Sequence, residues 1–277
     1  MLKHILLSFL LLTTTLLAED ARLNHYRDAT KWEKDANTNA DSAFNLGVTY
    51  HKKIKDYDKA IYWYKKAYKL DKGNDVANNL GYLYDDIKKY DDAIKWYKVG
   101  IEQGDADSSF NLALLYKRKI KDYPNAIKYY TKAYEMGESG GAFNLAMLYE
   151  ESLKDYPNAI KYYTKAYKMG DMGGANSLGY LYEHNLKDTK NAELWYKIAV
   201  SKNNKRAIGN LAKLYNKQNK KELGSAYMIS LINNGYTKSK VLTYLKTKWK
   251  LTDKELQKAY KLQLKLDIPK HYRGNIN

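Results

Sequence analysis

The chain has 277 residues, of which 44% are hydrophobic and 14% aromatic, and this composition excludes an intrinsically disordered protein, which would lack the apolar surface that offsets ordering entropy. The low numbers of proline (3) and glycine (16) disfavour a loop-rich β-sandwich and favour long helices, while the absence of cysteine excludes disulfides, thiolate zinc sites and cysteine nucleophiles. The formal net charge of +17 indicates either an anionic partner or a lysine-rich solvated surface.

The first predicted element is a secretory signal peptide over residues 1–18. Residues 1–4 are a short basic start, Ile5 to Leu17 is an apolar run, and the small residue Ala18 follows. This 13-residue run is shorter than the roughly 20 apolar residues that span a bilayer. We therefore expect an exported bacterial protein, periplasmic or secreted, without a transmembrane segment after signal removal. An uncleaved membrane anchor is the alternative.

A repeated sequence occupies most of the remaining chain. The fourteen letters KDYPNAIKYYTKAY occur at 121–134 and again at 154–167, 33 positions later. A shorter pattern, L-[GA]-x-x-Y, stands at six positions spaced by 32 to 34 residues, and it matches once more outside this spacing, at residues 223–227. Such a period is the signature of a repeat architecture, in which neighbouring copies cover each other's apolar faces. The six leucines are Leu46, Leu80, Leu112, Leu145, Leu178 and Leu211.

Each copy is predicted to form two helices. A second pattern, A-x-x-[WY]-Y-x-x-[AG], follows the first five leucine motifs and places its apolar residues on one stripe of period 3.6. Pro124 and Pro157 stand where this second helix begins, because a proline in the first turn loses no hydrogen bond. The small residue after each leucine allows the two helices to pack closely. The glycines predicted to cap the second helices in left-handed conformation are Gly104, Gly137 and Gly170.

The predicted fold class is therefore all-α, a right-handed α-solenoid of stacked helix-turn-helix repeats. Residues 19–42 are predicted to be a degenerate leading repeat, residues 43–236 to form the six repeats, and residues 237–277 to form a basic helical C-terminal cap. Within the cap we expect one helix from Thr237 to Lys248. The capping box of Thr252 and Glu255 predicts another helix that runs to about residue 266.

The two patterns resemble the signature positions of the Sel1-like repeat and its relative, the tetratricopeptide repeat, over about residues 23–236. The aromatic pair followed by alanine and then glycine favours the Sel1-like repeat. The resemblance implies a non-enzymatic scaffold that binds a protein or peptide ligand in a concave groove. The chain also resembles exported, cysteine-rich repeat proteins described as β-lactamases or penicillin binders, so a hydrolase is an alternative. It departs from that group by lacking every cysteine.

No catalytic, cofactor or metal site is predicted from the residues. The five histidines contain no i, i+4 pair, and no Ser-x-x-Lys or G-x-G-x-x-G sequence occurs. The acidic pairs Asp85-Asp86 and Glu150-Glu151 are interpreted as solvated helix surface rather than acid–base dyads. We therefore expect no cofactor.

Almost all the excess charge lies near the C-terminus. Residues 201–277 contain 18 basic and 4 acidic residues, whereas residues 19–200 contain 29 and 27. This imbalance predicts that the cap meets an anionic envelope surface, such as an acidic protein, anionic lipid or cell-wall polymer. Nucleic acid is not expected, because it lies in another compartment from an exported protein. A solvated lysine face without a ligand is the alternative.

An asparagine ladder gives the candidate binding residues. By resemblance to tetratricopeptide repeats, the residue before each signature leucine lies on the first helix and faces the concave groove. An amide offers both a donor and an acceptor, so a row of amides can bind the backbone of an extended peptide. Alternatively, these amides bond only to neighbouring helices. The ladder consists of Asn45, Asn79, Asn111, Asn144 and Asn210, with Ser177 in the fifth repeat and with Tyr82 and Tyr180 on the groove floor.

Overall fold

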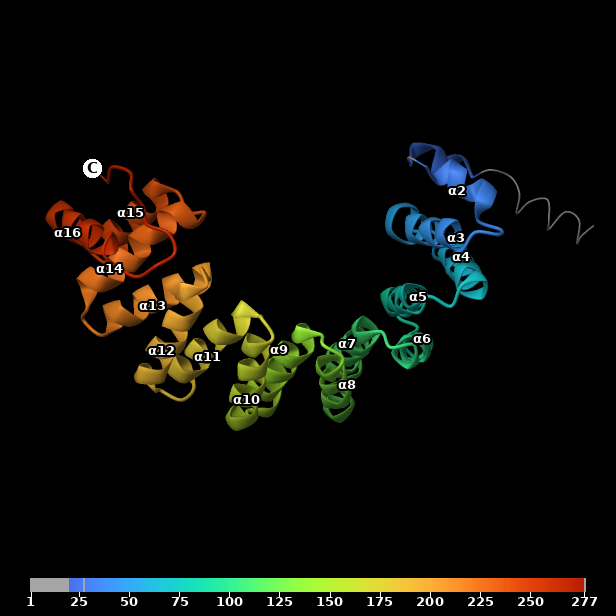
Figure 1. Ribbon diagram of the computed structural model, residues 1–277, viewed down its shortest axis with the longest axis horizontal. Coiled ribbons are helices and arrows are strands. Elements are labelled where there is room, and N and C mark those ends of the chain that lie inside the picture. Colours follow the sequence, from blue (N-terminus) through green and yellow to red (C-terminus); the bar gives the residue numbers. More distant parts are fainter. Residues whose placement is uncertain (1–19, 27, 277) are drawn as a thin grey trace, which may run out of the picture. The chain divides into compact units, whose positions relative to one another are not determined.

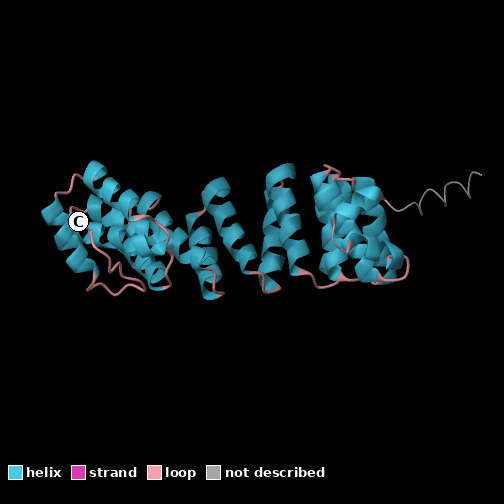
Figure 2. Ribbon diagram, turned by 90° about the horizontal axis from the view of Figure 1, so that it is seen from above, coloured by secondary structure: helices cyan, strands magenta, loops and turns pink. Residues whose placement is uncertain are grey.

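The computed structural model describes residues 20–26 and 28–276. The predicted signal peptide, residues 1–18, lies outside the described residues. Every regular element in the described part is helical, and Figure 2 shows helices joined by loops without a strand there. The predicted all-α class is confirmed. No helix among the described residues combines the length and the apolar character needed to span a bilayer.

The chain divides into two compact units, and the border between Tyr129 and Tyr130 falls within helix α8 (Tyr123–Glu135). The first unit contains the 3-10 turn η1 and the helices that lead to α8 (Figure 1). Its elements are η1 (Ala21–His25), α2 (Ala29–Asp35), α3 (Ala40–Val48), η2 (Thr49–Ile54), α4 (Tyr57–Leu70), α5 (Asn74–Asp86), α6 (Tyr90–Glu102), α7 (Ala106–Leu115) and η3 (Tyr116–Ile120).

The second unit continues the alternation of first and second helices and ends in the predicted cap. Both cap helices are present, and the capping box of Thr252 and Glu255 is formed. Its elements are α9 (Ser139–Met147), η4 (Leu148–Leu153), α10 (Tyr156–Lys168), α11 (Met172–His184), α12 (Thr189–Ser201), α13 (Lys205–Lys217), α14 (Lys221–Ser230), η5 (Leu231–Asn234), α15 (Lys238–Lys248) and α16 (Asp253–Gln263).

Local sequence rules fix the ends of the second helices. The helix α10 begins after Asp155, whose carboxylate accepts the backbone N–H of Asn158 at 3.1 Å, and Pro157 lies in its first turn as predicted. The predicted glycine caps are confirmed as well, because their φ angles are positive, between 87° and 96°. The capping glycines are Gly104, Gly137 and Gly170.

The turns between the two helices of a repeat have a feature that the sequence analysis did not predict. In three repeats the first helix widens into a π-helical turn, namely η2, η3 and η4. The residue that ends each of these turns is a lysine with positive φ, a conformation that costs energy for any residue with a Cβ. Left-handed lysines stand in five repeats, at Lys55, Lys88, Lys121, Lys154 and Lys187.

The two helices of a repeat are held together by a tyrosine ring that packs on a small residue. Tyr97 of α6 is buried, and its ring covers Gly81 of α5 so closely that a Cβ on Gly81 would lie 2.6 Å from Cδ1 of Tyr97. Two carbon atoms that are not bonded cannot come so close. The two helix backbones can therefore approach each other this closely only if the residue at position 81 has no side chain. The same contact joins Gly47 to Tyr64 and Gly179 to Tyr196.

We expect Gly81→Val to lower the free energy of unfolding by about 2–3 kcal/mol, because the added side chain overlaps the Tyr97 ring. Thermal or urea unfolding followed by circular dichroism measures this change. The matched control is Gly209→Val in α13, where an added Cβ meets no atom within 4 Å. Equal destabilisation by the two variants would contradict the ring contact as the cause.

Candidate functional site

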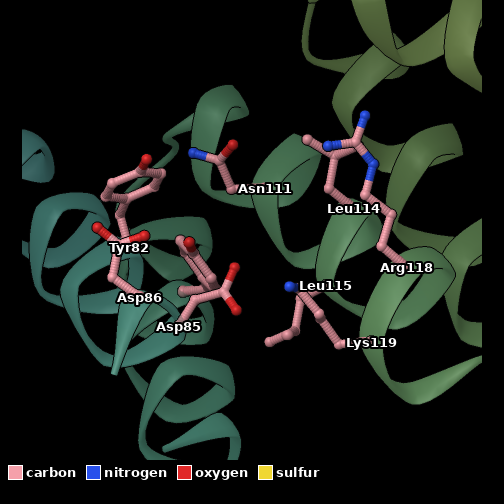
Figure 3. A pocket seen from close by; sticks show the side chains of 9 residues that line it. Tyr82, Asp85, Asp86, Asn111, Leu114, Leu115, Arg118 and Lys119 are labelled. Atoms are coloured by element: carbon pink, nitrogen blue, oxygen red, sulfur yellow. The ribbon is translucent and has the colours of Figure 1, made fainter. Parts of the chain in front are cut away.

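A cavity of about 200 Å³ in the first unit gathers side chains from two neighbouring repeats. Figure 3 shows the side chains of α5 on one side and those of α7 and η3 on the other. The lining combines two predicted groove residues with carboxylates, cations and apolar groups. Its residues are Tyr82, Asp85, Asp86, Tyr97, Asn111, Leu114, Leu115, Arg118 and Lys119.

Helical spacing brings these groups to one opening. On α5, Tyr82 lies three and four residues before the two aspartates, so all three share a face. On the next repeat, Asn111, Leu114 and Arg118 are separated by three and four residues and form a second row. Tyr82 remains 41% exposed, so its ring is accessible from the opening. The sequence pattern predicted Tyr82 and Asn111 here, and the structure brings them together.

The carboxylate of Asp86 is occupied by groups of the preceding repeat. His51, which is fully buried, donates from Nε2 to Oδ2 of Asp86 at 3.0 Å. Burial lowers the pKa of His51, although the hydrogen bond to Asp86 opposes this effect. Lys52 places its ammonium 3.9 Å from the same oxygen and 3.6 Å from the centroid of the Tyr82 ring. Asp86 is therefore a structural acceptor.

Asp85 is not solvated surface, as the sequence interpretation held, but half-buried in the cavity wall. Its Oδ1 atom is buried and receives no hydrogen bond from the residues that the structure describes. Burial raises the pKa of Asp85, the positive charge of Lys119 opposes that rise, and Asp86 adds to it. The prediction failed because α7 and η3 of the following repeat cover this end of α5, which the sequence of one repeat does not reveal.

The two basic side chains of the cavity, Lys119 and Arg118, form no ion pair within the described residues. Lys119 points toward Asp85, whereas Arg118 points away from both carboxylates (Figure 3). Arg118 is exposed and has no ion pair in the part of the chain that the structure describes. Asn111 donates from Nδ2 to Oδ1 of Asn78 at 2.9 Å, so its own Oδ1 stays available as an acceptor.

The equivalent positions of the second unit form a closed version of this arrangement. Glu183 and Lys217 stand where Asp85 and Arg118 stand, relative to their signature leucines. Lys217 Nζ lies 2.6 Å from Oε1 of the buried Glu183, and Tyr196 donates its hydroxyl to Oε2 at 3.0 Å. Each charged group of the second unit's copy therefore has an internal partner.

The remaining predicted groove residues lie on first helices and stay half-buried, except for Tyr180. Asn79 and Asn144 each donate to the carbonyl four residues earlier, at 2.8 and 3.0 Å. Asn210 donates to Oδ1 of Asn176 at 3.1 Å, which repeats the Asn111 contact. Tyr180 is 47% exposed and stacks on His184. Asn45 lies on α3, and no bond of its amide to another ladder residue is observed.

Glu150 is a further residue whose surroundings differ from the sequence interpretation. It is half-buried and accepts the hydroxyl of the buried Tyr163 at 2.7 Å, so it is not simply solvated. Burial raises the pKa of Glu150, and the hydrogen bond from Tyr163 opposes that rise. Within residues 20–26 and 28–276 no group of three or more His, Asp or Glu side chains could hold a metal ion. The hydrolase alternative stays a prediction.

Two repeat families match the sequence. The model of the Sel1 repeat matches residues 40–72, 139–171 and 174–208, and the model of the tetratricopeptide repeat matches residues 75–102 and 106–136. Together these matches cover more than half of the chain. A search of the curated proteins found no significant match.

The structure of this chain is similar to solved structures of helical repeat proteins. A Sel1 repeat protein from Oxalobacter formigenes is 26% identical with a TM-score of 0.50, and the match covers 87% of this chain and 97% of that one. A protective antigen of uropathogenic Escherichia coli with an SLR fold is 22% identical with a TM-score of 0.59 over 86% of this chain. The match spans only 55% of that antigen.

A third similar structure is the C-terminal part of a TPR repeat-containing protein from Cytophaga hutchinsonii. It is 16% identical with a TM-score of 0.57, over 79% of this chain and 92% of that one. At these identities the antigen and the Cytophaga protein show the fold alone. They confirm the predicted α-solenoid class.

We expect Asp85→Asn to raise the melting temperature at neutral pH. The gain in the free energy of unfolding should be about 0.5 kcal/mol or less, because the carboxylate of Asp85 is only half-buried. Since the folded-state pKa of Asp85 lies above its unfolded value, its ionisation costs stability as the pH rises past about 4. The benefit of the substitution should vanish below that pH. Thermal unfolding between acidic and neutral pH measures it.

The control is Asp86→Ala, which removes the acceptor of the buried His51 and should lower the melting temperature. A destabilised Asp85→Asn variant at neutral pH would show that the carboxylate of Asp85 is paired in the folded protein.

Proposed function

Because the chain belongs to the Sel1-like and tetratricopeptide repeat proteins, we propose that it is an interaction scaffold whose first-unit cavity binds an extended peptide segment of a protein partner. Repeats of these families generally mediate protein–protein interaction. The observation that carries the proposal is the unpaired state of Arg118 and of Asp85 Oδ1, in contrast to the closed Glu183–Lys217 pair. If these charged groups had only a structural role, we would expect them to pair with each other, as Glu183 and Lys217 do. Here they lie unpaired at a cavity.

The cavity favours a peptide with an acidic side chain. A guanidinium binds carboxylates through two parallel hydrogen bonds, and Arg118 is the exposed cation without an internal partner. The half-buried Leu114 lies beside it and offers an apolar contact for a neighbouring aliphatic residue of the peptide. A basic peptide side chain placed beside Arg118 would be repelled by its charge.

The backbone of the peptide would be held by the amide of Asn111, in the same row as Arg118, and by the aromatic ring of Tyr82 on the other side of the opening. Asn111 Oδ1 can accept a peptide N–H, and the exposed part of the Tyr82 ring can cover the peptide chain. Export of the protein, proposed on residues 1–18 alone, would place the partner outside the cytoplasm.

Panning a phage-displayed library of random peptides against the purified protein tests the proposal. We expect enriched peptides to share an aspartate or glutamate next to an aliphatic residue, and Arg118→Ala to weaken their binding about tenfold or more. Fluorescence anisotropy with a labelled peptide measures the affinity. Enriched peptides without an acidic residue, or unchanged affinity in the variant, would contradict the proposal.

Asn111→Ala and Asn78→Ala form a matched pair for the amide. Both variants remove the same 2.9 Å hydrogen bond and should lower stability alike, by about 1 kcal/mol or less. Only Asn111 lines the cavity, so only Asn111→Ala should also weaken peptide binding several-fold. Equal affinities of the two variants would restrict the asparagine ladder to packing.

A further inference from the structure

The last helix of the second unit carries a row of lysines on its outer face (α16, red in Figure 1). The inner face of α16 consists of Leu256, Ala259 and Gln263, which are buried against the unit. Three exposed lysines of α16 follow the spacing i, i+4 and i+7, which places them on the opposite face, and a fourth, Lys265, lies in the turn after the helix. This lysine ridge consists of Lys254, Lys258, Lys261 and Lys265.

The ridge is not neutralised by the acidic residues around it. Asp253 pairs with Lys246 at 2.7 Å, and Glu255 accepts the hydroxyl and the backbone N–H of Thr252 and lies 3.9 Å from Lys221. Glu222 and Glu255 line a small cavity beside Lys258, but no ion pair is formed by any ridge lysine in the described part of the chain. Like charges one turn apart repel each other on a helix. The described part of the chain therefore keeps four lysines close together without an ion pair.

The segment around the lysine ridge also has a large excess of positive charge. The segment 201–277 contains 16 lysines and 2 arginines against 4 acidic residues. Lysine is a point charge that attracts anionic surfaces without the bidentate geometry by which arginine selects single carboxylates. The ridge also lacks the buried aromatic and arginine anchors that stabilise protein interfaces; Leu264, 39% exposed, is the large apolar side chain that adjoins it.

We propose that the lysine ridge docks the protein on an anionic lipid bilayer. Clusters of four to eight basic residues attract anionic head groups, and the seven-residue step from Lys254 to Lys261 spreads the three lysines of α16 along about 10 Å of helix, with Lys265 in the turn that follows. The exposed Leu264 beside the ridge can enter the head-group region. This role is separate from the peptide cavity, which lies in the first unit.

Cosedimentation of the full-length purified protein with vesicles tests the proposal. The vesicles consist of phosphatidylcholine alone or of phosphatidylcholine with phosphatidylglycerol, at low and at high sodium chloride concentration. We expect binding only to the vesicles with phosphatidylglycerol, weakened at high salt because exposed charges are screened. The variant K254Q/K258Q/K261Q/K265Q should bind at least tenfold more weakly.

A second variant removes four exposed lysines from other helices and turns of the same unit and so has the same net charge. This control is K168Q/K190Q/K202Q/K213Q, and it should retain most of the binding. The variant with arginine at all four ridge positions should bind like the wild type, since it keeps the charge. Circular dichroism should show all variants folded, because the substituted side chains are exposed and unpaired.

If the ridge variant and the control variant lost the same amount of vesicle binding, the ridge would not be the docking site. Only the net charge would then explain the binding. Binding to pure phosphatidylcholine, or no binding to phosphatidylglycerol vesicles at low salt, would overturn the lipid surface as the partner. The second result would leave an acidic protein as the anionic partner of this region.

Discussion

The contact on which the structure depends is a buried tyrosine ring lying on a residue that has almost no side chain. In each unit it joins the first helix of a repeat to the second, as Tyr97 joins α6 to Gly81 of α5. The aromatic ring removes a large apolar area from water, and the glycine lets the two backbones approach. The alanine copies, such as Ala146, keep the position small and fully buried.

The same contact brings a polar group into the core, and the copies differ in how they satisfy it. The hydroxyl of a buried tyrosine needs a partner, and Glu150 and Glu183 accept it from Tyr163 and Tyr196. Among the described residues of the first unit, the hydroxyl of Tyr64 finds no hydrogen-bond partner, and Asp85 leaves one oxygen unsatisfied. Repeats of one sequence pattern have thus kept the packing while their polar positions diverged. The open copy is where we place ligand binding.

Much of the fold could be predicted from the sequence because its rules are local. The 33-residue period, the prolines in the first turns, the glycine caps and the capping box of Thr252 and Glu255 each depend on a few neighbouring residues, and each was found as expected. The wide π-helical turns and the left-handed lysines could not be predicted, since lysine has no preference for that conformation.

The candidate site could be predicted only in part, for a related reason. Tyr82 and Asn111 follow from their place in the repeat, but Asp85 and Arg118 gain their meaning from the neighbouring copy. A sequence pattern shows on which side of its helix a residue lies. It does not show which charged residue of the neighbouring repeat lies opposite. The decision whether an asparagine bonds to its own helix, as Asn79 does, or to the next repeat, as Asn111 does, also lies in the packing.

The most direct measurement compares two double-mutant cycles of thermal or urea unfolding, one on Glu183 and Lys217 and one on Asp85 and Arg118. We expect a coupling free energy of about 1 kcal/mol or more for the first pair, which is in contact at 2.6 Å, and none beyond error for the second. A similar coupling in both pairs would contradict the view that the first-unit copy is open and available to a ligand.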